Sequence, residues 1–322
     1  MMPGHALPLF SLMPKTNLSF IDKHPIRNPI LDRFRDWLGV IPFFIFILVF
    51  IILPSTNLFV GAFQDVKGNF TLENIHVMLN PYVLKSYGIS LQVSLITSLS
   101  GGIFGFLIAC AITIGKTPKW MRNILMTFSG LAANFGGVPL AFAFIATLGH
   151  TGFLTAIFKQ ICFPAAGGGQ TCPFDFYEMG FNLYSVLGLT LAYLYFQFPL
   201  MVLTITPALE GLKKEWREAS ENLGASSWQY WWLVALPVLW PSILGAMILL
   251  FASAFGAFAT AQALTGGSIY LVTILIGQQI RGDVLNNPNE GYALALGMVV
   301  VMGICIIGYT ILQRQTVKWL KS

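Results

Sequence analysis

Charged residues are scarce in this sequence of 322 residues. Asp, Glu, Lys and Arg make up 10% of the chain against 56% hydrophobic residues, and the mean hydropathy is +0.72. Soluble domains carry about 25% charged residues, so this balance excludes a soluble globular protein. A bilayer-spanning helix needs about 20 apolar residues. Six uncharged segments meet that length, so we expect an all-α polytopic membrane protein with transmembrane helices at roughly 38–60, 87–114, 124–148, 183–206, 239–264 and 292–312.

Groups for catalysis and metal binding are equally scarce. The four His residues are scattered without metal-ligand spacing, and Gly115-Lys116-Thr117 lacks the earlier glycine of a phosphate-binding loop, because Cys110 stands in its place. We therefore expect no catalytic residue, no metal site and no cofactor on this chain, which disfavours a membrane-embedded enzyme. A secondary transporter, the alternative class of ATP-independent carrier, usually has charged residues within its spans, and these spans have none.

Only four cysteines are present, and they fall into two pairs by location. Cys110 and Cys305 lie in predicted spans, where packing is the expected role. Cys162 and Cys172 flank a glycine-rich stretch in a predicted outer loop. In an oxidising compartment these two are expected to form a disulfide, and two free thiols are the alternative.

The basic residues predict the orientation of the chain. With the N-terminus inside, fourteen of the 18 Lys and Arg residues lie on the inner side and four on the outer side. Cytoplasmic loops of membrane proteins carry such an excess, so both termini are predicted to be cytoplasmic. The net charge of +5 then reflects topology and requires no nucleic-acid partner. We expect a cytoplasmic arm at 1–36 with an amphipathic interfacial elbow near 30–38, a transmembrane domain at 37–314 and a cytoplasmic tail at 315–322.

The longest polar loop, residues 207–238, is predicted to hold two short helices. Thr206 is the expected N-cap and Pro207 the first residue of the first helix, and Glu210 and Lys214 are spaced for an ion pair. Gly224 is expected to end this helix, and the Ser226 and Gln229 pattern predicts a capping box for the next. An apolar stripe follows the helical period at Leu209, Leu212, Trp216, Ala219 and Leu223.

The spacing within this loop resembles the EAA loop of binding-protein-dependent ABC importer permeases. Glu218-Ala219-Ser220 is followed after three residues by Gly224, after nine more by Val234, and after one more by Leu236-Pro237. The family pattern has Ala and Ile where this chain has Ser220 and Val234. The resemblance implies a type I importer permease fold over residues 38–314. It also implies contact with an ATPase subunit through Arg217, Glu218, Ala219, Ser220, Glu221 and Gly224.

The same resemblance implies the partners and the location. An ABC ATPase dimer, which holds ATP and Mg, a second permease subunit and a periplasmic or extracellular solute-binding protein are expected in a bacterial inner membrane. The second permease is expected to be a distinct chain, with a homodimer as the alternative. The chain itself is expected not to be an enzyme, because ATP hydrolysis occurs in the partner ATPase.

A few polar residues within the spans are candidates for the solute path. They are Asn134, Tyr193, Gln197 and Gln262. Bonding between helices is the alternative role for such side chains. The Asn134–Pro139 stretch is also expected to interrupt the third span, because Gly-Gly followed by Pro weakens a helix. Two short motifs, at 195–199 and 263–267, resemble the spermidine/putrescine-type branch and imply a polyamine-like solute; a phosphonate, iron or another small anion is the alternative.

Overall fold

The computed structural model describes residues 40–115, 117–160, 163–164, 170–171, 177–281 and 287–321. The chain divides into two compact units, Met1–Thr56 and Asn57–Ser322. The α-helices are α2 Ile41–Ile47, α3 Leu53–Ala62, α4 Glu73–Val77, α5 Pro81–Thr113, α6 Lys119–Asn134, α7 Gly137–Leu148, α8 Phe153–Gln160, α9 Val186–Glu210, α10 Lys214–Asn222, α11 Ser227–Tyr230, α12 Leu236–Phe255, α13 Ala259–Thr265, α14 Val272–Arg281 and α15 Pro288–Lys321. Two short π-helices, η1 Leu48–Ile52 and η2 Trp231–Ala235, and two strands, β1 Phe163–Pro164 and β2 Gln170–Thr171, complete the described elements.

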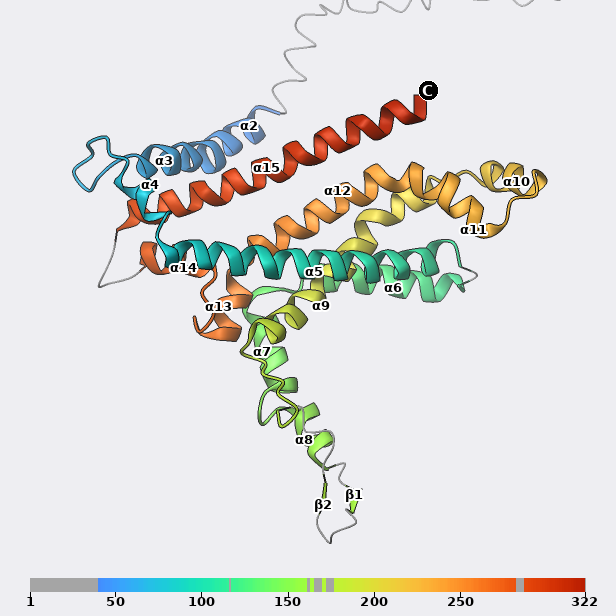
Figure 1. Cartoon of the computed structure of the whole chain (residues 1–322), viewed down its shortest axis with the longest axis horizontal. Helices are drawn as coiled ribbons and strands as arrows, with labels where there is room; N and C mark the ends of the chain where they lie inside the picture. The colour runs from blue at the N-terminus through green and yellow to red at the C-terminus, as the bar shows by residue number, and fades with distance from the viewer. Residues whose placement is uncertain are drawn as a thin grey trace, which may run out of the picture. The chain divides into compact units, whose positions relative to one another are not determined.

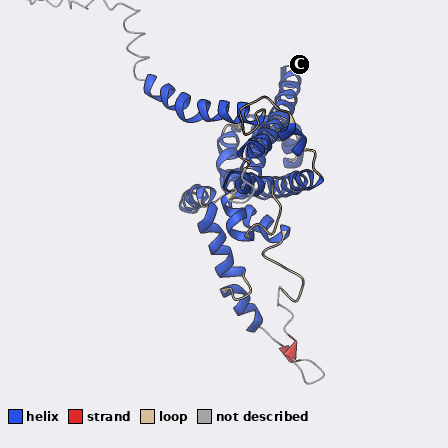
Figure 2. Ribbon diagram, turned by 90° about the vertical axis from the view of Figure 1, so that its left-hand side faces the viewer, coloured by secondary structure: helices blue, strands red, loops and turns tan. Residues whose placement is uncertain are grey.

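The fold is all-α, as predicted. The two strands pair in a two-residue antiparallel hairpin beyond α8, and helices form the rest of the regular structure in the described chain (Figure 2). Six helical stretches in that part of the chain are long and apolar enough to cross a membrane. They are Ile41–Ala62, Pro81–Thr113, Gly137–Gln160, Val186–Glu210, Ser227–Phe255 and Pro288–Arg314.

Helix α9 is the central element of the second unit. It packs against α5, α6 and α12, and Leu189, Met201 and Ile205 on it are fully buried. Glycines on α5 permit the closest of these contacts: a Cβ added at Gly101 would lie 2.5 Å from Gln197 Cβ, and one at Gly105 would lie 2.5 Å from Met201 Cβ. Gly101 and Gly105 therefore allow α5 to approach α9 closely.

The third predicted span, 124–148, is interrupted at the Asn134–Pro139 stretch, as predicted, and the stretch long enough to cross a membrane is Gly137–Gln160 instead. Helix α6 ends at Asn134, and α7 begins at Gly137 with a left-handed φ of +73° that favours glycine. Thr260 Oγ1 accepts a hydrogen bond of 2.8 Å from the Gly137 N–H and so ties the break to α13. Helix α6 runs beside α9, whereas α7 and α8 lead away from the bundle in both views (Figure 1, Figure 2).

Two further boundaries differ from the sequence prediction. The span predicted at 239–264 ends at Phe255, because Gly256 closes α12 and α13 forms a separate short helix after it. The span predicted at 87–114 begins earlier, at Pro81, where the Asn80 side chain caps the helix by accepting from the Tyr82 N–H at 3.1 Å. Helix α14, Val272–Arg281, is too short to be among the six candidate spans.

Candidate coupling surface and solute path

The loop between α9 and α12 forms two short helices joined by a tight glycine turn. Helix α10 ends at Asn222, and Gly224 follows in the left-handed conformation with φ +81°. The Ala225 N–H donates to Ser220 O at 3.0 Å and closes the turn. Ser226 and Gln229 then form the predicted capping box at the start of α11. The predicted pair of helices with a glycine hinge is confirmed.

The predicted start of the first helix was wrong. Helix α9 continues through Thr206 and Pro207 to Glu210, and the Thr206 hydroxyl donates to Val202 O at 2.6 Å instead of capping a new helix. Proline is accommodated there because its neighbours already fix a helical turn packed on α6. Lys213 occupies the N-cap position of α10. The expected pair of Glu210 with Lys214 is replaced by an ion pair between Glu210 and Arg122 of α6.

Apolar side chains on α10 and α11 are exposed. No residue of α10 is buried; Leu223 is 89% exposed, Trp216 37% and Trp228 71%. In Figure 1 these helices lie at one end of the bundle, the end that also holds the connection from α5 to α6. An exposed apolar patch of this kind typically marks a contact surface for another protein. We call residues 213–230 the knob.

Polar residues of the predicted EAA-like loop lie on the surface of the knob. Arg217 and Glu221 form an i,i+4 ion pair, with Nε to Oε1 at 2.9 Å. Ser220 Oγ donates to the Arg217 carbonyl at 2.7 Å, so its hydroxyl is satisfied within α10. Glu218 is exposed, and the described chain supplies no side-chain hydrogen bond to its carboxylate. Glu218, like Glu215 in the first turn of this helix, is therefore open to an external donor.

The base of the knob is fixed to the core of the bundle. Leu212, just before α10, and Trp231, just after α11, pack against the buried cluster that contains Leu209 and Leu239. Tyr230 is 8% exposed. Arg122 adds an ionic tie between the first turn of α6 and the last turn of α9. The sequence did not lead us to predict this ion pair, although Arg122 and Glu210 carry opposite charges next to the inner ends of two consecutive predicted spans.

The four candidate path residues fall into two groups. Tyr193 and Gln197, one turn apart on α9, are 1% and 0% exposed. Tyr193 OH donates to Ala257 O at 2.7 Å, and Gln197 Nε2 donates to Leu250 O at 2.9 Å. Both side chains thus tie α9 to backbone carbonyls, one within α12 and one just after its end. Gln197 Oε1 is buried without a partner in the described chain.

The other two candidates lie elsewhere. Asn134 is exposed at the end of α6, where its Nδ2 donates to Gly130 O at 2.9 Å. Gln262 is half-buried on α13. The predicted disulfide partners, Cys162 and Cys172, and the predicted N-terminal elbow lie outside the described residues. Within the described residues, no group of three or more His, Cys, Asp or Glu is arranged to hold a metal ion.

Comparison with known proteins decides the family. Residues 101–322 match the profile of the binding-protein-dependent transport system inner membrane component. The chain belongs to this family. It is thus the permease subunit of an ABC importer and a multi-pass membrane protein. Permeases of this family rely on a separate subunit for ATP hydrolysis.

Two relatives and one solved structure show the breadth of this family. The chain is 27% identical to the sulfate transport system permease protein CysT of Escherichia coli (strain K12), over 69% of this chain and 72% of the relative. It is 24% identical to the spermidine/putrescine transport system permease protein PotB of Haemophilus influenzae, over 83% of this chain and 90% of the relative. A bacterial ABC transporter that imports the acidic polysaccharide alginate shares the fold, with a TM-score of 0.67, 17% identity and coverage of 89% of this chain and 98% of that one.

Proposed function

We propose that the knob is the surface through which an ATPase subunit drives this permease. The observation that carries the proposal is the exposure of Leu223 and Trp216 on a helix pair whose base is packed into the core. Burying a leucine side chain stabilises a contact by about 1.5–3 kcal/mol, so covering this patch is favourable for a partner with an apolar groove. Glu218 supplies a charged hydrogen-bond acceptor beside the patch.

The packing of the base explains how the knob would move the spans. Leu212 and Trp231 hold the two ends of the loop against α9 and α12, so a displacement of the knob acts on both helices together. These two helices also pack against each other. Closure of the ATPase dimer around ATP and Mg would then be transmitted to the spans. In this proposed mechanism the permease changes conformation and forms or breaks no covalent bond.

The assembly follows from the same proposal. The knob would face the cytoplasm, which places both termini there, in a bacterial inner membrane. Two permeases are needed to give each ATPase a knob, and a distinct second chain is proposed. A solute-binding protein would deliver solute at the opposite end of the bundle. Single cysteines placed at Lys159 and Lys318 test the orientation: the proposed topology requires them to be labelled from opposite sides.

The solute is proposed to be small and charged. A polyamine is one candidate, supported by the PotB relative and by the Tyr195–Pro199 motif. A small oxyanion is the second candidate. It is favoured by the CysT relative and by the position of the acids: in the six candidate spans, Glu210 and Glu290 lie only in end turns, so the middle of the spans offers a cation no acidic partner. Calorimetric titration of the cognate solute-binding protein with spermidine and with sulfate separates the two.

Retention of the ATPase during purification tests the coupling surface. We expect Glu218→Ala and Leu223→Ala to reduce the amount of ATPase that co-purifies with the permease. Truncating a charged interface contact costs about 2–5 kcal/mol, and losing the burial of a leucine side chain costs about 1.5–3 kcal/mol. The matched control is Glu215→Ala, which removes an acid from the first turn of the same helix. Equal ATPase retention by wild type, Glu218→Ala and Leu223→Ala, at equal permease abundance, would refute the proposal.

A further inference from the structure

The contact between α12 and α15 separates two different surfaces of the bundle. Tyr309 of α15 packs over Gly245 of α12, and its hydroxyl oxygen would lie 3.1 Å from a Cβ added at that glycine. Helices α12 and α15 pack together, whereas α9 and α15 make little or no direct contact in the described chain. Tyr309 therefore lines both a cavity on one side of this contact and a groove on the other.

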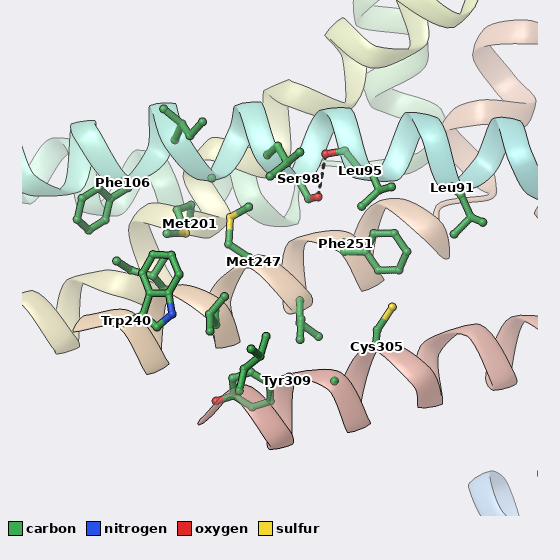
Figure 3. A pocket seen from close by; sticks show the side chains of 18 of the residues that line it. Leu91, Leu95, Ser98, Phe106, Met201, Trp240, Met247, Phe251, Cys305 and Tyr309 are labelled. Atoms are coloured by element: carbon green, nitrogen blue, oxygen red, sulfur yellow. Dashed lines mark hydrogen bonds between the residues drawn. The ribbon is translucent and has the colours of Figure 1, made fainter. Parts of the chain in front are cut away.

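The first surface holds an apolar cavity of about 680 Å³ between α5, α12 and α15. Figure 3 shows Leu91, Leu95 and Phe251 beside it, with Cys305 on α15. The one serine in its lining, Ser98, directs its hydroxyl to Leu95 O at 3.1 Å. Such a wall suits lipid chains or an apolar helix and offers nothing to a hydrated solute.

The second surface holds an open groove of about 510 Å³ between α9 and α12. Thr204, Ser242 and Tyr309 bring hydroxyl groups to it; Thr204 Oγ1 donates to Leu200 O at 2.9 Å, so it offers the groove an acceptor only. Pro207 and Pro241 also line it, and each proline lacks the N–H that would bond the carbonyl four residues earlier. The groove is thus lined by hydroxyls, prolines, small side chains and Leu249, and its lining residues carry no charge.

The groove lies where the knob can act on it. Thr204 and Pro207 precede the end of α9 at Glu210, and Pro241 and Ser242 follow the start of α12 at Leu236. The end of the groove nearest the knob is therefore formed by the last turns of α9 and the first turns of α12, and the groove continues along α12 to Leu249 beside Tyr309 of α15. Tyr193 and Gln197, by contrast, lie deeper along α9 with their polar atoms directed to backbone carbonyls.

We propose that this groove forms the exit end of the solute path, for a small hydrophilic solute that is contacted by hydroxyl groups without a paired charge. The proposal rests on the proposed function of the chain as a permease. It places the groove in the aqueous path. It places the cavity, which Cys305 of α15 lines, in apolar surroundings. Movement of the knob then changes the width of the exit directly, because the α9 and α12 walls of the groove continue into the loop.

Thiol accessibility in the assembled transporter tests this assignment. A charged, water-soluble thiosulfonate is applied to native membranes containing the Ser242→Cys variant, and modification at each site is measured by mass spectrometry. We expect the introduced thiol to be modified and the native Cys305 thiol to stay unmodified. An unmodified Ser242→Cys thiol, or equal modification of Cys305, would overturn the proposal.

Filling each surface gives a second test. Ser242→Phe places an aromatic ring in the groove, and Ile248→Phe places the same ring in the apolar cavity as the control. We expect Ser242→Phe to lose ATP-driven uptake while it retains the bound ATPase and its hydrolysis, and Ile248→Phe to keep uptake. Normal uptake by Ser242→Phe with the ATPase bound overturns the exit path alone. If no ATPase binds to the wild-type permease, the proposed function is overturned instead. If the Ser242→Phe variant fails to accumulate, the thiol accessibility test still decides the exit path.

Discussion

Replacing Gly224 by alanine is the most informative single change in the knob. Gly224 has φ +81°, and a Cβ built there meets no atom within 4 Å. The cost of an alanine is thus purely conformational, about 1–2 kcal/mol for a side chain in the left-handed region. Since about 1.4 kcal/mol is a factor of ten in an equilibrium, the population of the observed turn should fall about tenfold relative to re-aimed turns.

The expected result is a loss of ATP-driven uptake in Gly224→Ala with little change in permease abundance. Gly224→Asn should lose less, because asparagine tolerates the left-handed conformation better than other side chains. Gly68 offers a matched control: it has φ +84°, its added Cβ also meets no atom within 4 Å, and it lies in a turn outside the knob. The reasoning is refuted when Gly224→Ala transports like wild type, or when Gly68→Ala loses uptake equally.

Three further predictions concern stability and covalent structure. Gly105→Ala should lower the unfolding temperature in detergent, because overpacking costs about 1–3 kcal/mol. Gly88→Ala on the same helix, with open space around it, should not lower it, and equal shifts of the two variants would contradict this packing. Arg122→Ala should cost at most about 1 kcal/mol, since both partners of its ion pair are partly exposed, and the loss should shrink at high salt in the same melting assay; a larger, salt-independent loss would oppose it. Cys162 and Cys172 should appear as a linked peptide after non-reducing digestion, and recovery of two freely alkylated thiols would exclude the disulfide.

The elements that the sequence predicted best are those set by local chemistry. Gly224 and the Ser226–Gln229 capping box were predictable because left-handed glycine and reciprocal capping depend on neighbours within four residues. The break after Asn134 was predictable for the same reason. The six spans followed from apolar length, which the bilayer fixes for any helix.

The elements that the sequence mispredicted depend on packing across the chain. Pro207 favoured a new helix by local preference, yet α9 continues through it because its neighbours pack on α6. The role of Gln197 needed its distance to Leu250, and no pattern of spacing gives that distance. The groove beside Ser242 is lined by residues of α9, α12 and α15, so only the arrangement of these helices in space reveals it.

The most direct test of the central claim is a photo-cross-link from the knob. A benzophenone amino acid replaces Leu223, which is 89% exposed, in the assembled transporter, and Met179, 72% exposed in the loop before α9, carries the same probe as a control. The account predicts an adduct between position 223 and the ATPase subunit, and none from position 179. An intact complex in which position 223 yields no ATPase adduct would contradict the claim that this knob couples the permease to ATP.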